Sequence, residues 1–390
     1  MRIIIAEPSA TTFDRTHAAK SVIGHSLSLM ASGIDVVWFT NERSTLEYNA
    51  IPNYRIFPYT IYDDVRSGAI LKNILPRGWR YPLLVKKTYF ALLDGLRELN
   101  TMGEDHFFVP TADWVLLRAI QLLIENPQFR DQLPVFHILI MYENANWITG
   151  GYPYPKIIRL LRRLGSRVHL YTETKRHASS LAASLGRTVL PYPFPAHAET
   201  MRRDPQKNNY RVCFIGGGRR DKGFDLIPDI VRSFQEKVLA QDVTFTVQAP
   251  RPEDGLKQEL TSLLRMDCVE VLDNQLNEAK YQECLDACSI MVFPYNQGVY
   301  RSRGSGIVSE AVAHGIPYIC TEDTSLAEML EEGSGKVAIG ADEFAEAIAD
   351  IVKNYDDYSR NAIQAALLYR KRLLKSVLIE NVRGLAGADR

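Results

Sequence analysis

The sequence has no long hydrophobic run and few cysteines. The N-terminal segment, MRIIIAEPS, places only four apolar residues before Glu7, too few for the core of a signal peptide. No later segment approaches the roughly 18 apolar residues that span a bilayer. We therefore expect a cytoplasmic protein. The five cysteines are odd in number and lie mostly in apolar or helical runs, so they are expected to be reduced core thiols.

The chain also lacks net charge and a metal-binding motif. Its 46 basic residues balance 46 acidic ones, which argues against a general nucleic-acid binder. The charges are unevenly placed, because residues 1–195 carry 22 basic and 16 acidic side chains, or +6, and the remainder carries −6. No Asp-x-Asp pair or histidine cluster suits a metal ion. We therefore expect neither a metal nor a cofactor.

Short apolar runs alternate with amphipathic segments, which is typical of parallel sheets with crossover helices. The expected strands are 2–6, 34–40, 106–110, 134–141, 167–172, 210–216, 243–249, 268–272, 289–294 and 316–320. The segment 191–210 holds four prolines and no periodicity, as an interdomain linker does. We therefore predict two α/β domains, at 1–195 and 208–365. A long helical pattern at 357–387 predicts a C-terminal helix, counted as a separate element from 366 to 390.

One candidate site follows the first strand of the second domain, in CFIGGGRRDKGFDLIPDI at 213–230. Glycines allow close approach to a ligand, and a helix N-terminus with arginine and lysine favours a diphosphate. The predicted site residues are Gly216, Gly217, Gly218, Arg219, Arg220 and Lys222, the three cations being assigned to catalysis. A tight turn with solvated charges explains the pattern equally well. No Ser or Thr follows the lysine as in a Walker loop, and a dinucleotide fingerprint would need a third glycine at 221.

A second candidate is the stretch YRSRGSGIVSEAVAHGIPYIC at 300–320. A helix beginning near Gly306 would point its first amide groups toward the mouth of the sheet. The residues predicted to bind nucleotide are Ser302, Arg303, Gly304, Ser305, Gly306 and Ile307. Glu310 lies about one turn into the helix, where its carboxylate can accept two ribose hydroxyls, and it is assigned to the catalytic residues with the three cations. The alternative is a surface glutamate that the helix dipole favours.

Together the two segments resemble the retaining GT-B glycosyltransferases of the group 1 type. The matching residues are Lys222 and Gly223, Glu310 and Ala311, Gly315, and Pro317. The resemblance implies two doubly wound, Rossmann-like domains facing a central cleft, with a C-terminal helix that crosses back to the N-domain. It implies that the second domain binds a UDP- or GDP-sugar. The sugar would pass to a hydroxyl of a glycan or lipid-linked saccharide, with retention, in polysaccharide biosynthesis.

Three departures from the family pattern keep other functions open. Gly217 stands where the family has an arginine five residues before the lysine, so Arg219 or Arg220 must take its role. Ser302 replaces the family's first glutamate, and the glycines after it lie one position late. One alternative is a nucleotide-sugar epimerase or phosphorylase on the same fold. The other is a non-catalytic GT-B partner subunit.

The first domain should hold the acceptor, and its signals are weaker. Ser9 and Arg15, in the loop after the first strand, and Glu143, at the end of a later strand, are the candidate contacts. An ordinary strand-to-helix loop is the alternative. His137 lies inside an apolar strand and is expected to be a core histidine. The basic, aromatic helices at 77–93 and 156–167 suit core packing with solvated backs, and the alternative is peripheral contact with the inner membrane face.

Overall fold

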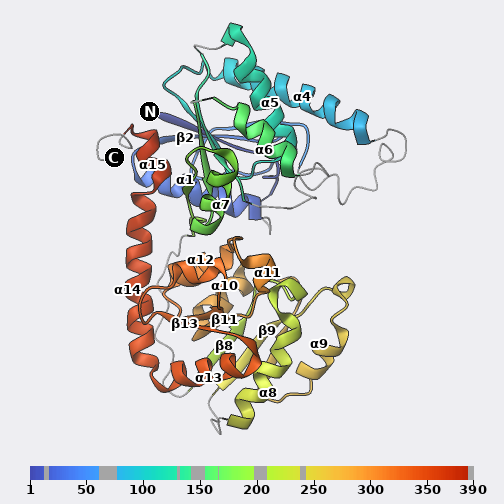
Figure 1. Cartoon of the computed structure of the whole chain (residues 1–390), viewed down its shortest axis with the longest axis vertical. Helices are drawn as coiled ribbons and strands as arrows, with labels where there is room; N and C mark the ends of the chain where they lie inside the picture. Colours follow the sequence, from blue (N-terminus) through green and yellow to red (C-terminus); the bar gives the residue numbers. More distant parts are fainter. Residues whose placement is uncertain are drawn as a thin grey trace. The chain divides into compact units, whose positions relative to one another are not determined.

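The computed structural model describes residues 1–12, 17–60, 77–129, 132–141, 154–165, 167–196, 209–237 and 243–384 (Figure 1). The chain divides into two compact units, Met1–Pro195 with Leu374–Arg390, and Ala196–Leu373. Each unit has one parallel sheet, so the α/β prediction is confirmed. Most of the predicted linker, residues 197–208, lies outside the described residues.

The first unit is a seven-stranded sheet of order β3-β2-β1-β4-β5-β6-β7. Its strands are β1 Arg2–Glu7, β2 Asp35–Asn41, β3 Asn53–Phe57, β4 His106–Val109, β5 Val135–Leu139, β6 Val168–Thr172 and β7 Leu190–Pro191. Its helices are α1 His17–Ala31, α4 Arg77–Glu98, α5 Trp114–Glu125, α6 Tyr154–Arg163, α7 Lys175–Leu185 and α15 Val377–Val382, with a short turn η1 at Pro127–Phe129.

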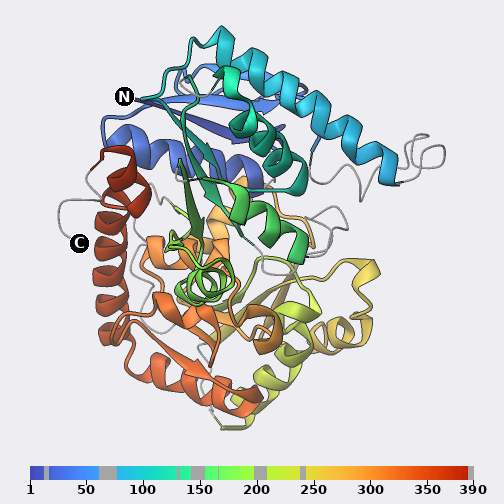
Figure 2. The same cartoon turned by 45° about the horizontal axis from the view of Figure 1, so that its top comes forward.

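Both faces of this sheet are buried. Alternate residues of β1 point to opposite faces: Ile4 packs with α4 to α7, and Ile5 packs with α1 and α15. Helices α4 and α5 lie side by side on the first of these faces (Figures 1 and 2). Burial on both faces explains why the central strands are continuous apolar runs in the sequence.

The second unit is a six-stranded sheet of order β10-β9-β8-β11-β12-β13. Its strands are β8 Tyr210–Phe214, β9 Val243–Gln248, β10 Val269–Leu272, β11 Ile290–Phe293, β12 Tyr318–Thr321 and β13 Gly335–Ala338. Its α-helices are α8 Ile227–Lys237, α9 Lys257–Leu263, α10 Glu278–Ala287, α11 Gln297–Tyr300, α12 Gly306–His314, α13 Gly340–Lys353 and α14 Tyr355–Leu374. Short 3-10 turns lie at η2 Arg220–Lys222, η3 Phe224–Leu226, η4 Pro252–Asp254 and η5 Ser325–Met329. Helices α10 and α12 lie on one side of the sheet and α8 and α13 on the other (Figure 1).

The helical pattern predicted at 357–387 is divided between α14 and α15. Ser376 stands before α15 as its N-cap, and its side chain accepts a hydrogen bond from the amide of Ile379. Leu378 and Val382 of α15 are buried in the core of the first unit with Val22. The end of the chain therefore returns to the unit in which it began.

Two further findings concern membrane contact and thiols. Within the described residues, no helix has both the length and the hydropathy needed to cross a bilayer. None of the five cysteines is paired with another, and four of them are buried.

Candidate functional site

The two predicted nucleotide-binding segments leave the second sheet at the same place. Strands β8 and β11 are neighbours at its centre, and the strand order runs outward from them in opposite directions. In an open parallel sheet, this reversal creates a crevice outside the carboxyl ends of the strands, where ligands bind. The loop 215–223 follows β8 and the loop 294–305 follows β11. The topology therefore brings both segments to this crevice.

Glycines allow the β8 loop to pack closely against its neighbours. Gly216 has a φ of 104°, which a side chain disfavours. A Cβ there would lie 3.0 Å from Cδ1 of Ile307, in the first turn of α12. A Cβ on Gly223 would lie 1.8 Å from the carbonyl oxygen of Pro294, in the β11 loop. The glycines therefore hold the two predicted segments in direct contact.

The amide groups of this loop are already bonded within the protein. Gly216 and Gly217 both donate to Oε1 of Gln248, at distances of 2.8 and 2.6 Å. Gln248 is the last residue of β9. The glycine loop therefore has a fixed shape, which β9 supports from beside it.

Lys222 is enclosed between the β8 loop and an aromatic ring. Its Nζ donates to the carbonyl oxygen of Gly216 and lies 5.4 Å from the ring centroid of Tyr295, a cation–π distance. Burial, followed by repulsion from Arg219, lowers the pKa of Lys222 to about 7. A small cavity lined by Lys222, Tyr295 and Pro294 adjoins it.

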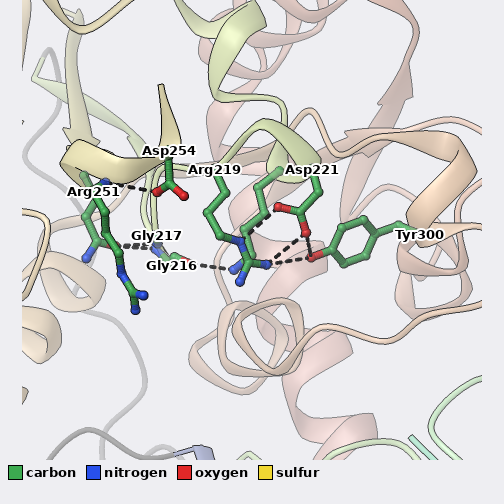
Figure 3. A network of polar contacts seen from close by, with 9 residues as sticks. Gly216, Gly217, Arg219, Asp221, Arg251, Asp254 and Tyr300 are labelled. Atoms are coloured by element: carbon green, nitrogen blue, oxygen red, sulfur yellow. Dashed lines mark hydrogen bonds and ion pairs between the residues drawn. The ribbon is translucent and has the colours of Figure 1, made fainter. Parts of the chain in front are cut away.

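The two candidate arginines, Arg219 and Arg220, have different partners in the structure. Arg219 makes a two-point ion pair with Asp221, in which Nε lies 2.9 Å from Oδ1 and Nη2 lies 3.0 Å from Oδ2. Figure 3 shows the hydroxyl of Tyr300 beside this pair. Arg220 instead pairs with Asp225 at 3.4 Å and Glu259 at 3.7 Å, and 60% of its side chain is exposed. Arg219 is therefore the arginine that faces the β11 loop.

Three cations of the site lie against a pair of tyrosines. The ring centroids of Tyr295 and Tyr300 are 4.5 Å apart. The guanidinium carbon of Arg303 lies 5.3 Å from the Tyr300 centroid, and Lys222 and Arg219 contact the same pair. Three positive charges thus surround one aromatic platform at the crevice.

Helix α12 begins at Gly306, where the sequence predicts. Ser305 occupies the N-cap position, and Ser302 and Gly304 precede it in the loop. Glu310 accepts a hydrogen bond at Oε2 from the hydroxyl of Tyr281, on α10. Glu310 also acts electrostatically on Lys222, so the carboxylate and the cations share one environment.

The acceptor candidates are less fully described. Ser9 is buried, and its amide donates to Oε1 of Glu7 at 3.0 Å. Arg15 and Glu143 lie outside the described residues. His137 is fully buried, with ring nitrogens 2.9 Å from His106 Nδ1 and 2.9 Å from the Tyr171 hydroxyl. The prediction of a core histidine is confirmed.

Sequence reasoning missed several residues of the site. Tyr295 and Tyr300 had a signal, since they lie in the β11 loop near its arginines, and Asp221 lies between two of the predicted cations. Gln248 had the weaker signal of a polar residue at the carboxyl end of a strand. Nothing in the local sequence marked Tyr281. In the described part of the chain, no group of three His, Cys, Asp or Glu side chains could hold a metal ion.

Residues 209–354 match the family model described as Glycosyl transferases group 1. The matched range spans both loops of the candidate site. No curated protein shows significant sequence similarity to the chain.

Solved structures match nearly the whole chain at low identity. A trehalose-6-phosphate protein from E. coli bound with UDP-2-fluoro glucose has a TM-score of 0.65 at 13% identity, covering 98% of this chain and 99% of that one. Anabaena HepE in complex with UDP and glucose has a TM-score of 0.65 at 13% identity, covering 99% of each chain. Sucrose-phosphate synthase from Thermosynechococcus elongatus has a TM-score of 0.63 at 13% identity, covering 99% of this chain and 98% of that one.

These likenesses show the GT-B fold, and residues 209–354 of the second unit are similar to the group 1 glycosyl transferases. The resemblance that the sequence predicts is confirmed at this level.

Proposed function

We propose that the protein transfers a sugar from a nucleoside diphosphate sugar to a hydroxyl of a glycan or lipid-linked saccharide, with retention of configuration. The donor would be a UDP- or GDP-sugar. Two structures with the same fold contain UDP or a UDP-sugar analogue. The acceptor would bind the first unit, where Ser9, Arg15 and Glu143 are the proposed contacts.

One observation carries this proposal: Lys222, Arg219 and Arg303 converge on the Tyr295–Tyr300 pair at the switch point of the second sheet. A nucleoside diphosphate leaving group gains negative charge as the bond to the sugar breaks. Fixed cations and the N-terminus of α12 can stabilise that charge without reorganising. Glu310 lies in the same environment, where its carboxylate can accept ribose hydroxyls.

A ligand screen followed by a turnover assay tests the proposal. UDP, GDP and ADP and their sugars are added in a thermal-shift experiment, in which a ligand at 100 times its Kd adds about 2.7 kcal/mol of stability. Transfer requires nucleotide release that depends on an added acceptor. An epimerase would interconvert the donor alone, a phosphorylase would need phosphate, and a non-catalytic subunit would show no turnover with any acceptor. Failure of every nucleotide to bind would refute the donor site.

We predict that catalysis does not need a metal ion, because the protein's own cations meet the developing charge. Activity in excess EDTA should stay within about twofold of activity in magnesium. A loss of more than about tenfold, or roughly 1.4 kcal/mol in the barrier, would contradict this prediction. Readdition of magnesium controls for damage by the chelator.

We also predict that kcat/KM for the donor falls as the pH rises above about 7. The pKa of Lys222 is lowered to about 7, so a rising pH removes the charge that meets the diphosphate. This pH profile reports groups of the free enzyme. Lys222→Arg should remove the decline, because a guanidinium stays charged. A wild-type profile that is flat or rising between pH 6 and 8.5 would contradict the prediction.

A further inference from the structure

The candidate site has no arginine five residues before Lys222. That position is Gly217, and the nearest arginine on the correct side of the crevice is Arg219. Arg219 is closer to Lys222 in sequence than the family's arginine is, so its side chain leaves the backbone at a different point. Another part of the protein must therefore hold its guanidinium in place.

Asp221 binds one edge of that guanidinium. The pair uses Nε and Nη2 of Arg219, at 2.9 and 3.0 Å from the two carboxylate oxygens. Nη2 also lies 3.3 Å from the hydroxyl oxygen of Tyr300. Within the described residues, Nη1 makes no hydrogen bond. This nitrogen, with two donor hydrogens, is therefore available to an anion.

Tyr300 is itself held rigidly. It is 2% exposed, and its ring packs against Tyr295. Its carbonyl oxygen accepts a hydrogen bond from Ser325 at 3.1 Å, and its hydroxyl lies 3.4 Å from Oδ2 of Asp221. The amide of Asn296 donates to the carbonyl of Asp221 at 3.0 Å. Asp221 thus joins the two loops through its backbone and its side chain, and Figure 3 shows its carboxylate between Arg219 and Tyr300.

We propose that Asp221 and Tyr300 are positioning residues, which hold Arg219 so that its Nη1 meets the diphosphate of the donor. They supply the placement that the family obtains from an arginine at the position of Gly217. The inference rests on the proposed function and adds two residues to it. Neither residue need touch the donor.

Asp221 has a second effect, on the charge of Lys222. Of the charged groups around this lysine, Arg219 and Arg303 disfavour its protonated form, whereas Asp221 and Glu310 favour it. The ring of Tyr295 contributes a cation–π contact. Loss of the Asp221 charge therefore lowers the pKa of Lys222. This shift reports the charge of Asp221 at the site, whereas nucleotide affinity reports the placement of Arg219.

The experiment compares Asp221→Asn and Tyr300→Phe with wild type. UDP and GDP binding is measured by calorimetry, and kcat/KM for the donor is measured across pH. Asp221→Asn should weaken nucleotide binding by about tenfold and move the decline in kcat/KM to lower pH. Tyr300→Phe should weaken binding by about threefold without moving the decline. Asp221→Glu should restore the decline to its wild-type position.

Asp225→Asn is the matched control, because it removes the carboxylate that pairs with Arg220. It should bind UDP and GDP within about twofold of wild type. If wild type binds neither nucleotide, the proposed function fails and this inference falls with it. If wild type binds and Asp221→Asn has equal or tighter affinity, only the positioning role is overturned, whatever the pH profile. Thermal unfolding of each variant verifies that it is folded.

Discussion

Lys222→Ala is expected to lower kcat for sugar transfer by on the order of 100-fold or more. The ammonium group lies at the switch point, against the carbonyl of Gly216 and the ring of Tyr295. A charge fixed in a site with little water interacts more strongly with a leaving diphosphate than a solvated charge would. Because the negative charge grows in the transition state, the loss should fall on kcat more than on KM.

Two further variants serve as controls for Lys222→Ala. Lys237→Ala removes an exposed lysine that pairs with Glu346 in the same unit, and it should leave kcat within about twofold of wild type. Lys222→Arg keeps the charge and should recover part of the lost rate. If Lys222→Ala is folded, binds donor and turns over like wild type, the β8 loop is an ordinary turn.

The central strands of both sheets could be predicted because burial on two faces makes them continuous apolar runs. The strands not predicted are β3, β7 and β13. β3 and β13 are half exposed, and β7 has two residues. Strands that are short or only partly buried carry little hydrophobic signal in the sequence. The division between α14 and α15 was also not predicted. Ser376 alone interrupts a helical pattern that is otherwise continuous.

The site could be predicted only where its chemistry is local in sequence. Three glycines with adjacent cations, and a glycine-broken loop before a helix, are visible within a few residues. The contacts that complete the site join distant positions. Gln248 is 31 residues from Gly217, and Tyr281 is 29 residues from Glu310. These pairings follow from strand order and helix packing, so the sequence alone could not show that Arg219 and not Arg220 faces the β11 loop.

Glu310→Gln is expected to weaken donor binding by about 10- to 150-fold, with a smaller effect on kcat. The substitution keeps the shape of the side chain and removes its charge. A hydrogen bond to a charged group contributes about 1.5 to 3 kcal/mol, and each 1.4 kcal/mol is a factor of ten in affinity. The ribose is remote from the breaking bond, so its contacts act on ground state and transition state alike. The loss should therefore be measured as a raised KM and a raised Kd for the donor.

Removal of the Tyr281 hydroxyl is a control for Glu310→Gln. It donates to Oε2 of Glu310, which fixes the orientation of the carboxylate. Tyr281→Phe keeps the charge and loses only this orientation, so it should weaken donor binding less than Glu310→Gln does. Glu283→Gln, on the exposed side of α10, should have no effect. Equal losses in Tyr281→Phe and Glu310→Gln would mean that the carboxylate serves the packing of α10 against α12, because a ribose ligand must respond to its charge.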